Sequence, residues 1–252
     1  HYHQRTKYDP DTIASKSQGL DWSQQPSSSK EYKIGTVYDL KPYLQSTKQD
    51  ADSHWWQRLS LFLLCSYGLT ARIQTMGEPM FFRASPSAGA LYPAEIYLVS
   101  RGNNLLPAGL YNYQVKDHTL IHFWASDVWQ SLQLACFMHP ALMVAELTLI
   151  TTAVFQRSAW RYQDRAYRRI CLDTGHLLGN IELAGSMNGF RSYFIGGFVD
   201  QAINELLYLN TELEGTIAVI PCVDLDAHPD PIILPFPTAL PSKINPEYPN
   251  LP

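Results

Sequence analysis

The stretch FRASPSAGALYPAEIYLV, from Phe82 to Val99, joins a loop of small residues to a strand. Glycine and alanine allow a ligand to approach main-chain amides closely, while Pro86 and Pro93 limit the flexibility of the loop. The residues EIYLV that follow are typical of a buried strand. The stretch therefore predicts either a seat for a flat ligand or a tightly packed turn ahead of a strand.

Composition narrows the classes of partner. The chain has 252 residues, of which 46% are hydrophobic, and a net charge of −4. This length allows one large domain or two small ones, and the charge gives no electrostatic case for binding nucleic acid or an anionic membrane. No segment reaches the ~18 apolar residues of a membrane span. We expect neither nucleic acid nor a membrane as a partner.

Cysteine and histidine patterns indicate the compartment and exclude a metal. Apolar neighbours surround each cysteine and no C-x-x-C pair occurs, which predicts reduced, buried thiols in a cytoplasmic protein. The histidines show no paired ligand spacing, so we predict no metal site. His176 and Asn180 share a helix face near Gly175 and Gly179, which favours a core hydrogen bond and close packing by another backbone. The cysteines are Cys65, Cys136, Cys171 and Cys222.

Hydrophobic periodicity predicts an α+β fold, because helices and strands are interleaved with a hairpin and without a G-x-G-x-x-G turn. A helix of about thirty residues, 160–189, exceeds the usual globular length and is expected to run through the body or along an interface. The other predicted elements are helices at 53–68, 126–139 and 200–209, strands at 95–100, 146–155, 190–197 and 215–222, and a hairpin at 109–124 around Lys116 and Asp117.

The chain divides into three parts. Residues 1–51 are polar and predict an irregular N-terminal arm, and residues 52–222 form the body domain. Residues 223–252 hold eight of the 17 prolines, which excludes helix or central strand and predicts a C-terminal arm or linker.

Several motifs together resemble the nitroreductase family, specifically its SagB/ThcOx-type branch. These are RASPSAGALYPAEIYLV with PAGLYNYQVKDHTL, the helix RYQDRAYRRICLDTGHLLGNIELAG, the segment IGGFVDQAINELLYLN, and LDWSQQPSSSKEYK near the start. The loop motif is fairly specific, whereas each of the others alone is weak.

The resemblance implies a nitroreductase-like α+β fold with a mixed or antiparallel central sheet flanked by helices, a long central helix and extended terminal arms. It also implies FMN bound at the interface of a homodimer, or of a pseudo-dimer with a related domain, and hydride transfer through flavin N5 to or from a small or peptide-borne substrate. The implied cofactor-binding residues are Arg83, Ser85, Pro86, Ser87, Ala88 and Gly89 on one side, and Gly196 and Gly197 on the other.

The sequence departs from the family where FMN phosphate is usually held. The R-x-S-x-R-type cluster expected before the first body helix is missing, because DLKPYLQSTKQDADSHWWQRL has no arginine before Arg58, and PCVDLDAHPDP after the last strand is acidic. Each lost charge-assisted bond is worth about 1.5–3 kcal/mol. An alternative function follows: a degenerate, non-catalytic half of a tandem protein that completes the interface of a related domain.

Two further features concern the predicted long helix. Arg161, Arg165 and Arg168 lie at i, i+4 and i+7, which predicts one basic stripe for an anionic partner or for ion pairs with Asp164 or Asp173. Azoline oxidases of the resembled branch carry a Lys-Tyr pair just before this helix, where this chain has Arg161 and Tyr162. Arginine is too basic to act as a general base, so Tyr162 is the catalytic candidate, as an acid or hydrogen-bond donor, or else a packed aromatic.

Overall fold

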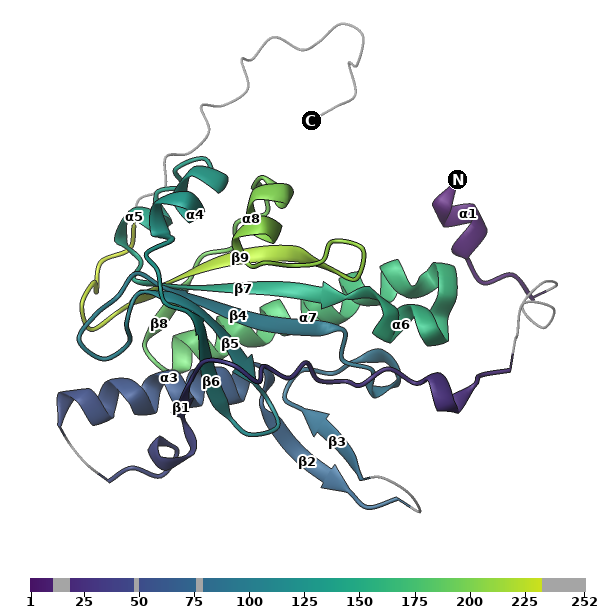
Figure 1. Ribbon diagram of the computed structural model, residues 1–252, viewed down its shortest axis with the longest axis horizontal. Coiled ribbons are helices and arrows are strands. Elements are labelled where there is room, and N and C mark those ends of the chain that lie inside the picture. Colours follow the sequence, from purple (N-terminus) through teal and green to yellow (C-terminus); the bar gives the residue numbers. More distant parts are fainter. Residues whose placement is uncertain (11–18, 48–49, 76–78, 233–252) are drawn as a thin grey trace, which may run out of the picture.

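A seven-stranded sheet forms the centre of the molecule (Figure 1). The computed structural model describes residues 1–10, 19–47, 50–75 and 79–232. The strand order is β1-β6-β5-β4-β7-β9-β8, and every pairing in the sheet is antiparallel. This confirms the predicted α+β class and the antiparallel central sheet. The strands are β1 (Thr36–Asp39), β4 (Ala94–Ser100), β5 (Gly109–Gln114), β6 (Thr119–Trp124), β7 (Leu147–Val154), β8 (Phe190–Ser192) and β9 (Glu214–Asp224).

Helices cover both faces of the sheet (Figure 1). On one face, α3 and α7 enclose an apolar core that includes Phe62 and Ile181; on the other, α4 and α8 enclose a second core that includes Leu132 and Ile203. The central strands β4 and β7 are buried almost throughout because both faces are covered. The helices are α1 (Tyr2–Thr6), α3 (Ala51–Tyr67), α4 (Trp129–Ala135), α5 (Ala141–Val144), α6 (Phe155–Tyr162), α7 (Ala166–Met187) and α8 (Asp200–Leu206), with short 3-10 turns η1 (Trp22–Gln24), η2 (Lys41–Tyr43), η3 (Ala88–Ala90) and η4 (Gln163–Arg165).

The predicted single helix over 160–189 is wrong at its start. The chain forms α6, turns through η4 and then forms α7. Gln163 has a φ of 46°, a left-handed conformation that breaks the run of helical hydrogen bonds. Arg161 therefore lies on a different helix from Arg168, and the predicted basic stripe does not form.

Part of the predicted irregular arm belongs to the folded body. Thr36–Asp39 pairs with β6 as an edge strand, and Leu40 is fully buried in the core beneath α3. Residues 27–32, here called the strap, cross the sheet and reach buried charges of the body. At the other end, β9 continues to Asp224, and most of the proline-rich arm, 233–252, lies outside the described residues.

A hairpin that the sequence did not predict projects from the body between α3 and the small-residue loop (Figure 1). Its strands are β2 (Leu69–Ile73) and β3 (Met80–Arg83). Ile73 and Met80 pair in register and their side chains are 54% and 45% exposed. The hairpin thus presents apolar side chains to solvent.

Two of the four cysteines contradict the expectation of burial. Cys136 and Cys222 are buried, and burial raises the pKa of their thiols to about 11 and about 12. Cys65 and Cys171 are free and exposed. No helix of the described ranges is both long and apolar enough to cross a membrane. Within the same ranges, no group of three or more His, Cys, Asp or Glu side chains is placed to hold a metal ion.

Candidate functional site

The small-residue loop turns sharply between β3 and β4. Gly89 has a φ of 67° and lies within the turn η3, and Ala90 and Tyr92 also have positive φ values. Such a conformation is strained for residues with a Cβ and persists only where the surroundings hold it. Those surroundings come from α7 and from the end of α6.

Asp173 of α7 holds the loop in place. Its carboxylate accepts a 2.6 Å hydrogen bond from the Ser87 hydroxyl and 3.2 Å hydrogen bonds from the Ala88 amide. The Ser87 hydroxyl in turn accepts a bond from the Tyr92 amide at 2.9 Å. Burial raises the pKa of the Asp173 carboxyl, against the hydrogen bonds from Ser87 and Ala88, which lower it. The Ser87 hydroxyl and the Ala88 amide are therefore hydrogen-bonded to α7.

Tyr162 lies directly over Gly89. A Cβ added at Gly89 would be 3.0 Å from the Tyr162 hydroxyl and 3.4 Å from Nη1 of Arg161. Arg161 is exposed, and the guanidinium of Arg169 lies 5.2 Å from the Tyr162 ring centre. The structure thus brings Tyr162 and Gly89 together, and these side chains occupy the space over the glycine.

Arg83 is enclosed beneath the loop. Its guanidinium lies 4.5 Å from the Tyr67 ring centre and 4.7 Å from that of Tyr92, and its Nη2 donates to the Ser28 carbonyl at 2.5 Å. Nη1 of Arg83 and Oγ of Ser85 are buried without a hydrogen-bond partner among the described residues. Ser85 is fully buried, so its hydroxyl is reached only if the loop moves.

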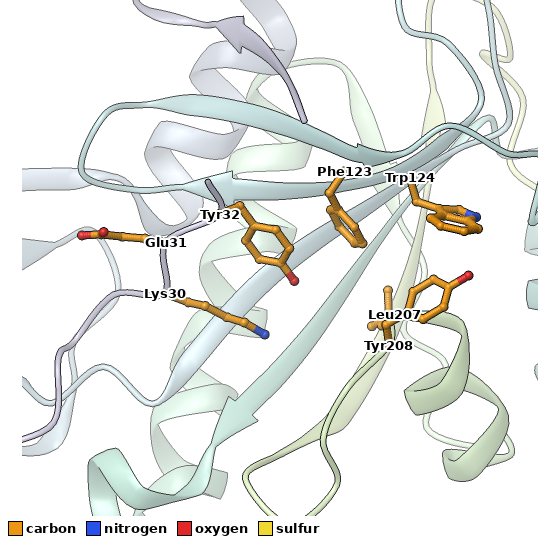
Figure 2. A pocket seen from close by; sticks show the side chains of 7 residues that line it. All are labelled: Lys30, Glu31, Tyr32, Phe123, Trp124, Leu207 and Tyr208. Carbon is orange, nitrogen blue, oxygen red and sulfur yellow. The ribbon is translucent and has the colours of Figure 1, made fainter. Parts of the chain in front are cut away.

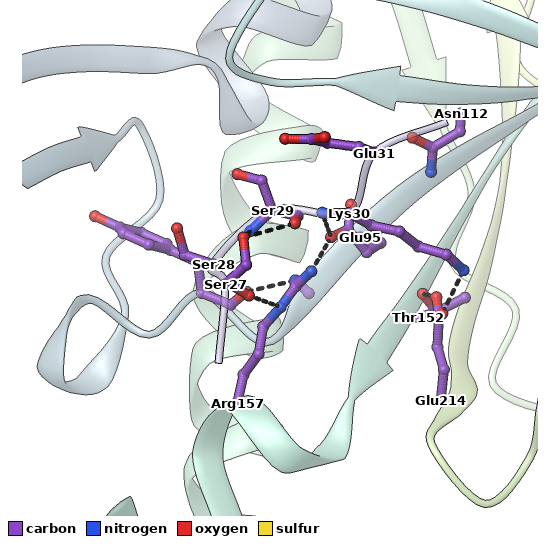
Figure 3. A network of polar contacts seen from close by, with 12 residues as sticks. Ser27, Ser28, Ser29, Lys30, Glu31, Glu95, Asn112, Thr152, Arg157 and Glu214 are labelled. Carbon is purple, nitrogen blue, oxygen red and sulfur yellow. Dashed lines mark hydrogen bonds and ion pairs between the residues drawn. The ribbon is translucent and has the colours of Figure 1, made fainter. Parts of the chain in front are cut away.

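Next to Arg83, an ion pair is closed off from water by the strap (Figure 3). Arg157, at the start of α6, lies 2.6 Å from the Glu95 carboxylate, and the two side chains are 4% and 3% exposed. Arg157 also donates to the Ser27 carbonyl at 2.8 Å, and Glu95 accepts from the Lys30 amide at 3.0 Å. Burial raises the pKa of Glu95, while the Arg157 guanidinium opposes that rise.

The strap inserts one lysine beside a second buried carboxylate. Nζ of Lys30 donates to Glu214 and to the Tyr97 hydroxyl, each at 2.7 Å. Glu214 also accepts from Thr152 at 2.5 Å. Burial is the largest single influence and lowers the pKa of Lys30, but the attraction and hydrogen bond of Glu214, together with Tyr32 and Glu95, outweigh it and the net pKa is raised. Lys30 therefore carries its charge, and that charge is neutralised inside the protein.

These pairings decide whether FMN fits the loop. Its phosphate is a dianion that needs several cations or free amides. Arg157 and Lys30 are paired with carboxylates, and Arg83 lies enclosed beneath the loop, where Nη2 donates to a strap carbonyl and Nη1 has no partner among the described residues. The Ala88 amide is taken up by Asp173, and the space over Gly89 by Tyr162. The buried cations beneath the loop therefore do not form a phosphate site on their own, and the exposed Arg161 beside Gly89 is the basic group that the loop surface itself offers.

Other predicted site residues lie apart from the loop. Gly196 and Gly197 are exposed, next to the bridge between Ile195 and Val219, and a Cβ at either would meet no atom within 4 Å. His176 is exposed and bonds to the Leu172 carbonyl, so the predicted core hydrogen bond of His176 is wrong. Pro86, which belongs to the loop itself, is exposed.

Exposed apolar side chains lie along the outer face of α7, together with the polar His176 and Ser186. Leu172, Leu183 and Met187 are 51%, 67% and 79% exposed on one side of the helix. Gly175 and Gly179 lie on the same side, and a Cβ at either would meet no atom within 4 Å. Within the described residues no other backbone packs on these glycines, contrary to the sequence expectation.

Four polar residues of this region were not predicted as a site: Lys30, Glu95, Arg157 and Glu214. A signal for one of them exists, because Glu95 is the second residue of a strand whose other residues are almost all apolar. A carboxylate inside a buried strand is rare unless it is paired. The partners cannot be read from the sequence, since Lys30 and Glu214 are 184 residues apart.

A family model described as the Nitroreductase family matches residues 69–222 of the chain. A protein of Methanocaldococcus jannaschii assigned as a nitroreductase is 30% identical over 151 residues, which cover 60% of this chain and 73% of the relative. The trifolitoxin-processing protein TfxB of Rhizobium leguminosarum is 30% identical over 155 residues, covering 59% of this chain and 41% of TfxB.

The crystal structure of a protein from Anabaena variabilis, assigned as a nitroreductase, superposes with a TM-score of 0.86 at 64% sequence identity. The match covers 89% of this chain but only 46% of the Anabaena chain. This chain therefore spans less than half of that relative.

Proposed function

This chain belongs to the nitroreductase family, and from that membership we propose that it is one body of a two-body, FMN-dependent oxidoreductase. In this proposal a second nitroreductase-type body pairs with the outer face of α7 and holds the phosphate of the flavin. This chain supplies the loop from Pro86 to Gly89 as one border of the shared site. The pair transfers hydride to or from a small or peptide-borne substrate.

One observation carries the proposal: the loop is bonded to the same helix whose outer face carries exposed apolar side chains without a packing partner among the described residues. Asp173 binds Ser87 and Ala88 on the loop side of α7, while Leu183 and Met187 face solvent. An exposed apolar stripe interrupted by glycines suits close approach by another helix. A partner on this stripe would also reach Gly89.

The internal pairing of the basic side chains supports a phosphate site on the second body rather than on this chain. With Arg157 and Lys30 paired and Arg83 enclosed beneath the loop, the phosphate of a flavin needs further basic groups, which the second body supplies in this proposal. The match to less than half of a 64% identical chain from Anabaena supports a second body in the same protein or in a partner. We also propose that Tyr162, over Gly89, donates a hydrogen bond at this border.

We propose the SagB/ThcOx-type branch and a peptide-borne substrate for the pair. Support comes from the PSAGALYP loop and from the similarity to TfxB, a protein named for processing trifolitoxin. Two other site residues of the sequence prediction, Gly196 and Gly197, are exposed and open, and we retain them as cofactor-binding candidates only within the assembled pair.

Flavin binding by the single body is the first test. The purified chain is expected to be colourless, and added FMN is expected to leave its melting temperature unchanged, because only a ligand that binds the folded state raises it. Absorption spectroscopy after purification and a thermal melt with increasing FMN measure both. A yellow protein that releases FMN on heating would show that this body holds the phosphate itself, and would overturn the proposed division.

Pairing through α7 is the second test. The chain alone is expected to self-associate through this face, and Leu183→Arg to abolish the association, because a charge cannot be buried in an apolar interface without a partner. Sedimentation velocity over a range of protein concentrations measures it. Leu134→Arg, on α4, is the matched control, since Leu134 is also an exposed helical leucine, at 61%. A wild-type chain that remains monomeric at every concentration, or equal loss in both variants, would contradict the proposed face.

A further inference from the structure

A cleft of about 370 Å³ lies on the face of the sheet opposite α7, and no residue of the small-residue loop lines it (Figure 2). Three segments enclose it: the strap, the end of β6 and the end of α8. It is at the small end of the range for ligand pockets. The lining residues are Lys30, Glu31, Tyr32, Phe123, Trp124, Leu207 and Tyr208.

Aromatic rings form both walls. Tyr32 and Phe123 lie with ring centres 4.8 Å apart on one side, and Trp124 and Tyr208 lie 4.9 Å apart on the other. Trp124 and Tyr208 remain 44% and 62% exposed, although their rings contact each other. Two large aromatic side chains left partly exposed beside a cleft offer stacking surface to a flat molecule.

The inner end of the cleft is polar. Figure 2 shows the ammonium of Lys30 and the hydroxyl of Tyr32 pointing into the space between the strap and Leu207. An ammonium has three N–H donors, and two of those on Lys30 bind Glu214 and the Tyr97 hydroxyl. The third donor lies next to the Tyr32 hydroxyl, and an acceptor in the cleft would share that donor. Glu214 already neutralises the lysine charge, which favours an uncharged acceptor over an anion.

Stability alone does not account for this lysine. A buried ion pair gains little over apolar side chains of similar volume, because desolvation of both charges offsets their attraction. The strap is anchored independently by the hydrogen bonds of Arg157 to Ser27 and of Arg83 to Ser28. The ammonium at the end of an aromatic cleft is better explained by recognition.

We propose that this cleft binds a small, uncharged aromatic compound that carries a carbonyl oxygen. The ring stacks between the Tyr32–Phe123 wall and the Trp124–Tyr208 wall, and the carbonyl oxygen accepts the third N–H of Lys30. No residue of the loop lines the cleft, so this site is separate from the one proposed for the flavin and its test does not depend on that proposal.

The test uses acetophenone as the probe and two matched compounds, benzoate and cyclohexyl methyl ketone. The first replaces the neutral acceptor by an anion and the second removes the aromatic ring. Binding is followed by NMR through the indole N–H of Trp124, assigned with Trp124→Phe. Acetophenone is expected to produce a saturable shift, and each matched compound to bind about fivefold more weakly. The absence of a saturable shift, or equal binding of all three compounds, overturns the proposal.

Substitutions measure the contributions of the aromatic walls and of the polar end to binding separately. Tyr208→Ala removes an exposed ring and is expected to weaken acetophenone binding about fivefold without unfolding the chain, whereas Phe137→Ala, also an exposed aromatic at 70%, is expected to have no effect. Lys30→Met is expected to reduce affinity about tenfold by removing the charged donor. Should Lys30→Met fail to fold, the pair of Tyr208 and Phe137 variants still decides the question: equal affinity in both overturns the proposal.

Discussion

At the scale of single residues, the most consequential contact is between Glu95 and Arg157, which water barely reaches. Removing one partner of such a pair leaves an uncompensated charge, at a cost of about 3–5 kcal/mol. We therefore expect Arg157→Met to lower the free energy of unfolding by this amount in urea denaturation. Arg157→Met combined with Glu95→Gln should recover part of the loss, because no lone charge is then buried. A double variant no more stable than the single one would show that the charge is not the cause.

His118 is a second single-residue case, in which the direction of a pH effect can be stated. Its ring bonds to the Ser60 and Tyr113 hydroxyls, and burial lowers its pKa from 6.5 to about 4, although Asp39 opposes the shift and Lys41 adds to it. Between these values the unfolded state binds the proton and the folded state does not, so stability falls as the pH falls.

We expect the free energy of unfolding to drop by about 2 kcal/mol from this residue between pH 7 and pH 4.5. His118→Asn should remove that part of the pH dependence while tolerating the left-handed backbone, where φ is 51°. Chemical denaturation of both proteins at the two pH values gives the free energy of unfolding of each. The buried carboxyls are present in both proteins, so their effects cancel when the two pH dependences are subtracted. Parallel pH profiles would show that His118 does not titrate in this range.

The sequence predicted local features of residues well and distant partners poorly. It identified the small loop ahead of β4, since glycine and proline act on their own backbone. It did not predict that Asp173 would bind Ser87, or that strap carbonyls would bind Arg83 and Arg157, because such contacts depend on the closed fold.

At the scale of elements, α7 offers a test in which stability and association change in opposite directions. Gly179 faces open space on the outer side, so Gly179→Ala is expected to raise the free energy of unfolding by about 0.5–1 kcal/mol through helix propensity. The added methyl group should at the same time weaken self-association. Thermal melts and sedimentation velocity on the same sample measure both.

Gly185 of the same helix is the control for that experiment. A Cβ there would lie 2.8 Å from the Phe190 carbonyl oxygen and 2.9 Å from Oγ of Ser192, so Gly185→Ala is expected to destabilise the chain, by about 1–3 kcal/mol. If Gly179→Ala also destabilised the monomer, the outer face of α7 would be covered within the chain itself.

The periodicity of apolar residues predicted whether a segment is a helix or a strand, but it did not predict where each element begins and ends. The strands β4, β7 and β9 and the hairpin of β5 and β6 were predicted because apolar residues mark them clearly. The split between α6 and α7 was missed, because a single left-handed Gln163 leaves no trace in the hydrophobic pattern. The hairpin of β2 and β3 was missed because its exposed strands lack the alternation of a half-buried sheet.

At the scale of the whole molecule, the two parts of the N-terminal region differ in importance. The first helix, α1, contacts the body through exposed groups such as the pair of Arg5 and Asp164, 60% and 54% exposed. Such pairs contribute about 0–1 kcal/mol. The strap instead satisfies the buried charges Glu95, Arg157 and Glu214.

We therefore expect removal of residues 1–20 to change the urea midpoint little, and removal of residues 1–32 to lower it strongly. Deleting the strap exposes Glu95 and leaves Glu214 without its cation, which costs several kcal/mol. Denaturation of the two truncated chains beside the full chain gives the comparison. Equal midpoints for both truncations would mean that water replaces the strap without loss.

The separation of Lys30 and Glu214 by 184 residues has a consequence for biosynthesis. A ribosome adds about 5–20 residues per second, so the lysine emerges roughly 10–40 s before its acidic partner. During that interval Lys30 and Glu214 cannot pair, so the strap, although synthesised long before β9, is among the last segments of this body to dock. Native structure is thus completed only once β9 has been translated.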